Sequence, residues 1–209
     1  MHLNKTNILE TEKIKRINLI NSISGIKPAN LIGTASKDKN SNLAIFSSVI
    51  HLGSDPALLG FILRPKDEVP RHTYENILET EHYTINQVNK SISKQAHYTA
   101  AKFDRGVSEF EQCKLTEEYC YGFHAPFVKE SLLKIGMKYL ESIPIKRNGT
   151  TLVIGEIQHL IIADQAINDE GYIDYQMLNS SGIVGLNSYY TLNKSEDYPY
   201  PRPSELPDF

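Results

Sequence analysis

The sequence lacks the features that mark secreted, membrane-spanning and nucleic-acid-binding proteins. No apolar run approaches the ~18–20 residues that a membrane helix needs, and residues 1–16 have no apolar signal-peptide core. The formal net charge of -3 gives no general attraction to nucleic acid or to an anionic membrane surface. We therefore expect a cytoplasmic protein that binds neither nucleic acid nor membrane.

Cysteine is scarce, and the histidines do not follow the spacing of a metal-binding motif. In the cytoplasm Cys113 and Cys120 are expected to be reduced thiols. Their spacing matches neither a redox CxxC pair nor a zinc knuckle, so we interpret both as structural residues. The seven histidines are scattered and no HExxH is present, so no metal site is predicted.

Three sequence motifs of common enzymes are also missing. There is no G-x-x-x-x-G-K-[ST] phosphate loop and no G-x-G-x-x-G after a strand. These absences argue against P-loop and doubly wound nucleotide-binding enzymes. G-x-S-x-G is missing as well, which removes the strongest sign of a serine hydrolase.

What the sequence does contain is a series of short β-rich runs separated by polar turns. Such turns indicate antiparallel pairing, because parallel strands need long crossovers. Asn148-Gly149 favours the left-handed φ angles of a type I′ turn and predicts a hairpin over Ile145–Ile154. The other predicted strands are Leu31–Ser36, Leu43–Leu52, Ala57–Leu63, Tyr83–Val88, Phe127–Leu140 and Thr151–Ile162.

About six or seven antiparallel strands with a few short helices predict one domain over residues 1–209. We expect a mainly β, α+β fold, an antiparallel split or closed β-barrel. Residues 1–30 form an N-terminal arm in this interpretation. The expected helices are Glu12–Asn21, Thr73–Glu79 with Thr73 as N-cap, Ser91–Phe103 and Ser108–Cys113.

The C-terminal segment, 191–209, alternates proline with aromatic residues and is expected to be extended, polyproline-like chain. Two interpretations remain open for it. It is either a disordered end or an arm that packs its tyrosines on the domain or on a second subunit. Three nearby tyrosines favour packing, since they are unusual in a free tail: Tyr189, Tyr198 and Tyr200.

Polar side chains gather in one part of the sequence, near predicted strand ends and a helix start. Ser47 and Ser48 interrupt an otherwise apolar strand, and small hydroxyls beside Ala44 would let a flat ligand approach the backbone. The full set is Asn42, Ser47, Ser48, His51, Arg64, Arg71, His72, Thr73 and Asn76.

The second half of this set is suited to a phosphate. Arg64 and Arg71 bracket the polar stretch Pro65–Pro70, and Thr73 begins the predicted helix. Two guanidinium groups, a hydroxyl and the N–H groups of a helix start form a natural phosphate pocket. An exposed strand face and a solvated loop would show the same residues, so both alternatives stay open at this level.

The order of several segments resembles the flavin reductase-like family of FMN-binding split barrels. The resemblance runs from about Pro28 to Tyr190 and depends on the order and spacing of its parts. These parts are Asn42–Pro56, Leu59–Pro65, Arg71–Ile77, Tyr83–Asn86, Ser108–Phe110, Ala125–Ser131 and Gly155–Ile157.

This resemblance implies a homodimer with FMN near the subunit interface. It implies that the strand with Asn42, Ala44, Ser47 and Ser48 grips the isoalloxazine ring. It also implies that the phosphate is held by Arg and Thr groups matching Arg64, Arg71 and Thr73. His72 and Lys102, which follows the helix containing His97, are carried over as further cofactor-binding residues; a surface lysine closing a helix is the alternative for Lys102.

A flavin performs redox chemistry itself, so no catalytic side chain is predicted. The favoured function, from the resemblance, is an NAD(P)H-dependent flavin reductase that transfers hydride from NADH or NADPH to flavin and serves a partner oxygenase. The alternative is a non-enzymatic FMN protein that carries electrons between redox proteins. A split barrel that binds heme or another ligand is a third reading.

Overall fold

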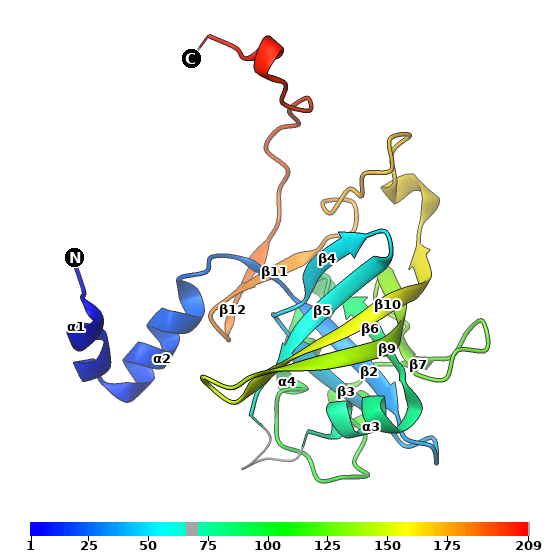
Figure 1. Ribbon diagram of the computed structural model, residues 1–209. Helices are drawn as coiled ribbons and strands as arrows, with labels where there is room; N and C mark the ends of the chain where they lie inside the picture. Colours follow the sequence, from blue (N-terminus) through cyan, green and yellow to red (C-terminus); the bar gives the residue numbers. More distant parts are fainter. Residues whose placement is uncertain (66–70, 209) are drawn as a thin grey trace.

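The computed structural model describes residues 1–65 and 71–208 (Figure 1). Its helices are α1 (Lys5–Glu10), α2 (Lys13–Ser22), α3 (His72–Thr80), α4 (Ser93–Tyr98) and α5 (Glu109–Cys113), with short 3₁₀ turns at Lys90–Ile92, Asp164–Ala166 and Pro203–Glu205. Its strands are β1 (Lys27–Pro28), β2 (Asn30–Ala35), β3 (Ser41–Phe46), β4 (Ile50–Ser54), β5 (Ala57–Leu63), β6 (His82–Gln87), β7 (Glu117–Glu118), β8 (Phe127–Val128), β9 (Leu133–Ile145), β10 (Thr150–Ile162), β11 (Ser181–Val184) and β12 (Ser188–Thr191).

A seven-stranded antiparallel sheet in the order β3-β2-β6-β9-β10-β5-β4 forms the body of the protein. β3 and β4 are its two edges, yet they are consecutive in sequence. The link over residues 47–49 spans at most about 14 Å, whereas a flat sheet of this size would separate its edges by about 29 Å. The sheet must therefore curl into a barrel that stays open between β3 and β4. The prediction of a mainly β, antiparallel fold with short helices is confirmed.

The predicted single strand over Leu43–Leu52 is wrong, because the chain leaves one sheet edge and joins the other within it. The break falls at the two serines. The Ser48 hydroxyl accepts a hydrogen bond from the Ile62 N–H at 3.1 Å and donates to the Ile62 carbonyl at 3.2 Å. This side chain thus takes the place of a backbone partner for β5 where the strand is interrupted.

The predicted hairpin exists, but its turn is not type I′. β9 and β10 pair from Ile145↔Thr150, which leaves a four-residue loop, residues 146–149. Gly149 has a φ of 71°, whereas Asn148 is not left-handed. Instead, the amide oxygen of Asn148 accepts hydrogen bonds from the Thr150 N–H at 3.2 Å and from the Thr150 hydroxyl at 2.8 Å. Asn148 therefore stabilises the loop through its side chain.

The helix predicted over Thr73–Glu79 is α3, but Thr73 is not its N-cap. Arg71 holds that position, and Thr73 lies one residue inside the helix. Thr73 is buried against the barrel.

The strand predicted over Phe127–Leu140 also needs correction, since residues 129–132 separate β8 from β9.

Two apolar cores lie on opposite sides of β2, whose six residues are all buried. Hydrophobic side chains on the two sides of a strand point alternately in opposite directions. The first core fills the barrel with Ile32, Phe61, Leu63, Ile77, Tyr83, Ile85, Met137 and Val153. The second lies beneath α4 and α5 and contains Leu31, Leu43, Val88, Ile92, Phe110, Val128 and Ile183.

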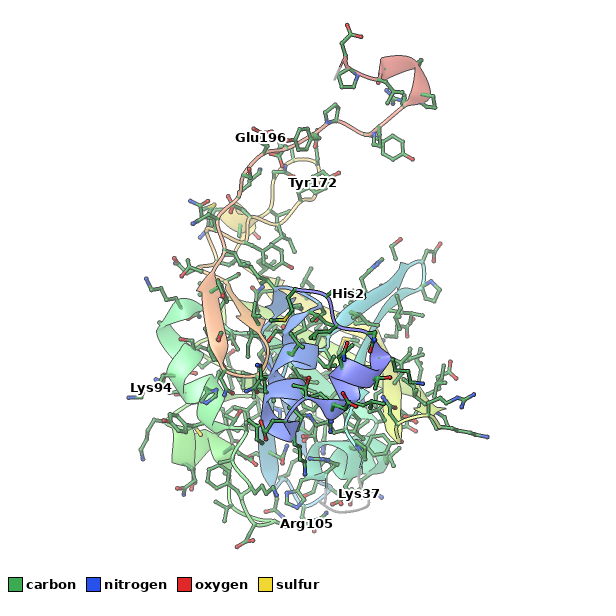
Figure 2. The ribbon with its side chains drawn as sticks, turned by 90° about the vertical axis from the view of Figure 1, so that its left-hand side faces the viewer. His2, Lys37, Lys94, Arg105, Tyr172 and Glu196 are labelled. Atoms are coloured by element: carbon green, nitrogen blue, oxygen red, sulfur yellow. The ribbon has the colours of Figure 1, made fainter. Side chains whose placement is uncertain are left out.

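A small sheet, β1-β11-β12, joins both chain ends to the barrel. Beyond it the tail extends away from the body, as Glu196 marks in Figure 2. Tyr198 and Tyr200 are 81% and 79% exposed, so they do not pack on their own domain, while Tyr189 lies in β12 with its hydroxyl 3.4 Å from His97 Nδ1. Across the described residues, no helix is long and apolar enough to cross a membrane.

Close packing on the side of β2 that faces away from the barrel core makes one glycine testable. A Cβ at Gly33 of β2 would lie 2.4 Å from the Pro126 carbonyl oxygen and 2.6 Å from the Thr84 hydroxyl. We expect Gly33→Ala to lower the free energy of unfolding by about 2–3 kcal/mol, as overpacking does. In the control Gly53→Ala, the new Cβ has an ordinary contact at 3.5 Å. Equal urea midpoints for the two variants would contradict this packing.

Candidate functional site

The structure brings the start of α3 against the edge strand β3. The Asn42 amide donates a 2.9 Å hydrogen bond to the Thr73 hydroxyl, and both side chains are buried. This contact joins residues 31 positions apart in sequence. One residue predicted to grip the ring and one predicted to hold the phosphate therefore lie side by side.

Arg64 and Arg71 lie near one another at the end of β5 and the start of α3. The Arg71 guanidinium donates from Nε and Nη2 to the Pro65 carbonyl, at 3.2 and 2.9 Å. Burial lowers the pKa of Arg71, and the charge of Arg64 lowers it further. An anion would relieve this repulsion. Residues 66–70, most of the polar stretch predicted between the arginines, lie outside the described residues.

The N-terminus of α3 adds hydrogen-bond donors to the same place. α3 has nine residues, and the Arg71 side chain makes no capping hydrogen bond to the described residues. The first N–H groups of a helix have no partner within the helix, and its dipole favours a negative charge there. Guanidinium groups beside such a helix start suit a phosphate, so this donor set fits the phosphate group of a flavin mononucleotide.

A buried carboxylate that the sequence reading did not select lies behind this cluster. Glu109 of α5 is 6% exposed, and its Oε2 accepts a 2.9 Å hydrogen bond from the Leu43 N–H of β3. Burial raises the pKa of Glu109, while the hydrogen bond from Leu43 and the nearby His72 act in the opposite direction. Glu109 thus covers the free edge of β3 and faces His72. Glu109 lies within the Ser108–Phe110 segment of the resemblance, but no local sequence pattern marks its carboxylate as buried.

The residues predicted to hold the ring follow β3 to its end. Ala44 is half-buried and pairs with Ile32 of β2. Ser47 and Ser48 are half-buried in the link between the sheet edges, where the hydroxyl of Ser48 is engaged by Ile62.

Lys102 stands apart from the cluster in the contacts that the structure shows. It lies between α4 and α5, and its side chain is exposed. It makes no hydrogen bond or ion pair with the part of the chain that the structure describes. The contacts therefore join Asn42 to Thr73 and associate Arg64, Arg71 and His72 with them, but leave Lys102 outside.

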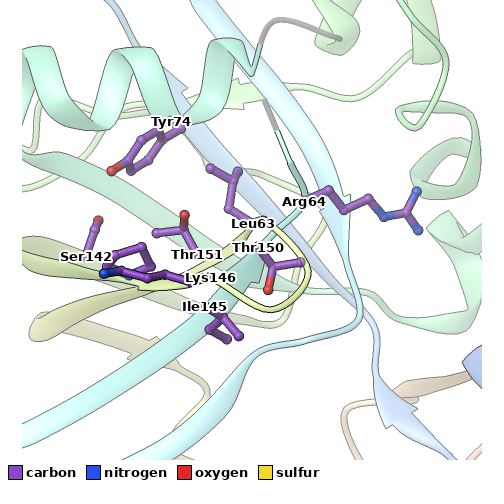
Figure 3. Close-up of a pocket in the computed structure, with 10 residues that line it drawn as sticks. Leu63, Arg64, Tyr74, Ser142, Ile145, Lys146, Thr150 and Thr151 are labelled. Atoms are coloured by element: carbon purple, nitrogen blue, oxygen red, sulfur yellow. The ribbon is translucent and has the colours of Figure 1, made fainter. Parts of the chain in front are cut away.

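A pocket of about 380 Å³ opens beside Arg64, between α3 and the β9–β10 hairpin (Figure 3). Arg64 alone of the predicted flavin-binding residues lines it, and its side chain extends away from Tyr74. The other lining residues were not selected from the sequence, because they come from β5, α3 and the hairpin and meet only in the folded chain: Leu63, Tyr74, Ser142, Pro144, Ile145, Lys146, Gly149, Thr150 and Thr151.

The curled antiparallel sheet agrees with comparisons to known proteins. The flavin reductase like domain matches residues 25–179, which is most of the chain. The chain belongs to the flavin reductase-like family. Several solved structures share its fold, and one of them is described as having a split barrel domain.

Three of them illustrate the range of relatives of this flavin reductase-like protein. A putative flavin reductase with a split barrel domain from Shewanella frigidimarina NCIMB 400 is 50% identical, with 96% of this chain and 100% of that chain covered and a TM-score of 0.93. Nitrilotriacetate monooxygenase component B from Bacillus cereus is 19% identical, with coverages of 95% and 98% and a TM-score of 0.82. A flavoredoxin of Desulfovibrio vulgaris (Miyazaki F) is 22% identical, with coverages of 84% and 91% and a TM-score of 0.72.

Because the pKa of Glu109 is raised, the folding stability of this flavin reductase-like protein should depend on pH in a specific way. Ionising Glu109 costs more in the folded chain than in the unfolded chain, so its contribution to stability falls as pH rises above its ordinary value of 4.5. Glu109→Gln keeps an acceptor for the Leu43 N–H without the charge. We expect its stability relative to the parent protein to increase with pH from 4.5 upward, measured by urea unfolding.

The matched control for this change is Glu111→Gln, an exposed carboxylate on the same helix. That variant should stay within about 0.5 kcal/mol of the parent protein at every pH. A pH profile of Glu109→Gln that is parallel to those of the parent and the control would show that burial does not perturb Glu109.

Proposed function

We propose that this chain binds FMN and acts as an NAD(P)H-dependent flavin reductase. Membership of the flavin reductase-like family establishes a flavin-related redox protein at the coarser level. The observation that carries the choice of FMN is the cationic cluster at the start of α3, where Arg71 and Arg64 adjoin the Asn42–Thr73 contact. A terminal phosphate is the part of FMN that riboflavin lacks, and it is what this cluster suits.

Each residue has a defined part in the proposed site. Arg64, Arg71 and Thr73, with the first N–H groups of α3, hold the phosphate, and His72 adds a polar side chain there. Asn42, Ala44, Ser47 and Ser48 line the approach of the ring. Lys102 is retained as an outer cofactor-binding residue that has no contact with this cluster in the structure.

The flavin, when bound, supplies the hydride-accepting ring, so the protein needs no general acid or base for that transfer. What the chain contributes is binding and orientation. Charge-assisted hydrogen bonds contribute roughly 1.5–3 kcal/mol each, so two or three of them would anchor the cofactor by its phosphate. Glu109 positions β3 by its hydrogen bond to the Leu43 N–H rather than by contact with the cofactor.

We further propose a cytoplasmic homodimer with FMN near the subunit interface. The similarity to a protein named as a monooxygenase component supports an oxygenase as the recipient of reduced flavin. NADH and NADPH are both retained as electron donors.

The second candidate is an FMN protein that carries electrons between redox proteins without turnover of a nicotinamide. The similarity to a flavoredoxin favours it. The two functions share the same cofactor site, so the geometry of the cluster supports both. The family match favours the reductase. Heme binding has no supporting contact among the described residues.

The phosphate-binding role of the arginines is tested by comparing two flavins. Arg71→Ala and Arg64→Ala should each raise the Kd for FMN roughly ten- to hundred-fold, as loss of a charge-assisted hydrogen bond predicts. The Kd for riboflavin should change less than three-fold, about 0.6 kcal/mol. Isothermal titration calorimetry measures both.

Arg202→Ala, an exposed arginine in the tail, is the matched control and should leave both affinities unchanged. Equal losses for FMN and riboflavin in the Arg64 and Arg71 variants would show that these side chains do not bind the phosphate. FAD in a third titration tests whether a dinucleotide flavin is accepted as well.

The choice between reductase and carrier is made by nicotinamide oxidation. With FMN present, the purified protein should oxidise NADH or NADPH with multiple turnovers, followed by loss of absorbance at the nicotinamide band. A protein that holds FMN but turns over neither donor is the electron carrier. Heat-unfolded protein with the same FMN concentration corrects for the reaction of free flavin.

A further inference from the structure

The N-terminal arm, defined here as residues 1–26, carries an apolar side that its own barrel does not cover. Neither α1 nor α2, both fully described, buries a residue, and Figure 1 shows them standing away from the barrel. Ile14, Ile17 and Ile20 are spaced three apart on α2 and are 60%, 38% and 44% exposed. Side chains at this spacing are neighbours on a helix surface.

These helices are too short to be stable without a partner. α1 has 6 residues and α2 has 10, whereas isolated helices shorter than about 12–15 residues are marginal in water. Arg16 links them by donating to the Leu9 and Thr11 carbonyls, so the arm is one small unit. A unit of this size needs apolar burial to persist, and its own barrel does not supply it.

A second uncovered apolar surface lies on the barrel, on the side of β4, β5, β10 and β9 that faces away from the core. Ile50 pairs with Gly60, and a Cβ built on Gly60 would lie 3.0 Å from both Leu52 and Leu152, so these side chains share one face. Leu152 pairs in turn with Ile143 of β9. Ile50, Leu52 and Ile143 are 44%, 40% and 45% exposed.

We call this surface the outer sheet face. An antiparallel sheet with one solvated side normally carries polar residues there. β4 is also an edge strand of the described sheet, and natural proteins cover or charge such edges. Ile50, Leu52, Leu152 and Ile143 therefore form an apolar patch of the kind that marks an interface, with Glu141 of β9 as a polar neighbour on the same face.

The accessible surface area of the chain is larger than that of a compact monomer of its mass, as expected if part of it is buried by a partner. The chain exposes 13468 Å², whereas a compact monomer of 23.7 kDa exposes roughly 9,800 Å². The excess is several times the about 800 Å² that each partner buries in a standard interface. The arm and the tail both extend away from the body and add to this exposed surface (Figure 1).

We propose that the arm packs the Ile14, Ile17 and Ile20 side of α2 on a second copy of this chain, and that the outer sheet face is the barrel's share of the same interface. The inference rests on the proposed homodimer and names the surfaces that form it. A second copy brings one arm and one sheet face of its own, so a two-fold arrangement covers both pairs at once.

The test uses full-length chains that each gain one negative charge. Ile17→Glu places it on the apolar side of α2, and Asn18→Glu, the control, places it about 100° around the same helix. Ile50→Glu places it on the outer sheet face, and His51→Glu, the control, is its exposed neighbour on β4. Sedimentation velocity over a concentration series measures the Kd of the dimer.

The parent protein should sediment as a dimer, with a mass twice that of the 23.7 kDa chain. Ile17→Glu and Ile50→Glu should each raise the dimer Kd at least ten-fold, with changes below two-fold for the two controls. Circular dichroism and the urea midpoint confirm that each barrel is folded. Dimers that form equally tightly in all variants would overturn the inference and leave the proposed homodimer standing.

A second measurement identifies whose barrel the arm contacts. Equal amounts of ¹⁴N- and ¹⁵N-labelled protein are mixed, equilibrated and treated with a lysine cross-linker, and products from Lys13 and Lys15 are read by mass spectrometry. Mixed-isotope products to the barrel are expected. Products of a single isotope only would place the arm on its own barrel, and a monomer at every concentration would overturn both the arm inference and the homodimer. Flavin affinity enters neither outcome.

Discussion

The short link between β3 and β4 is the constraint on which the rest of the structure depends. Residues 47–49 join the two outer strands of a seven-stranded sheet, so the sheet has to curl until its edges approach. Ser48 anchors this link by hydrogen bonds to both backbone groups of Ile62 in β5. The same curl carries Arg64, just past the end of β5, toward the side of the barrel on which α3 begins. A flat sheet would leave the predicted ring-binding and phosphate-binding residues on distant edges.

The cluster at the start of α3 combines charges that need a partner with groups that already have one. Burial and then the neighbouring charge of Arg64 lower the pKa of Arg71, whereas Asn42 and Thr73 are hydrogen-bonded to one another at 2.9 Å. Behind them burial raises the pKa of Glu109, while the hydrogen bond from the Leu43 N–H and the nearby His72 act in the opposite direction. The rigid polar contacts position β3 against α3, and the unbalanced positive charge is what an anionic ligand would stabilise. In this site one set of residues therefore positions β3 against α3, and another set provides the positive charge.

Local sequence patterns predicted most elements and missed what depends on chain crossing. Antiparallel strands, the β9–β10 hairpin and α3 follow from β-rich runs, turn residues and spacing, which act over a few neighbouring positions. The break at Ser47–Ser48 does not, because an apolar run on both sides is equally suited to one strand. The cap position of Thr73 was misassigned since its hydroxyl serves Asn42 across the barrel. Glu109 and the hairpin residues beside Arg64 join the site through contacts between distant segments, which no local pattern records.

The family of this chain is established by its flavin reductase like domain, and the central proposal is that its own residues make that domain an FMN site. Direct titration of the flavin-free protein with FMN, followed by quenching of flavin fluorescence, tests this claim most directly. The account predicts saturation at one FMN per chain and a yellow protein that retains its colour through gel filtration. A protein that stays colourless and leaves flavin fluorescence unchanged across the titration would contradict it.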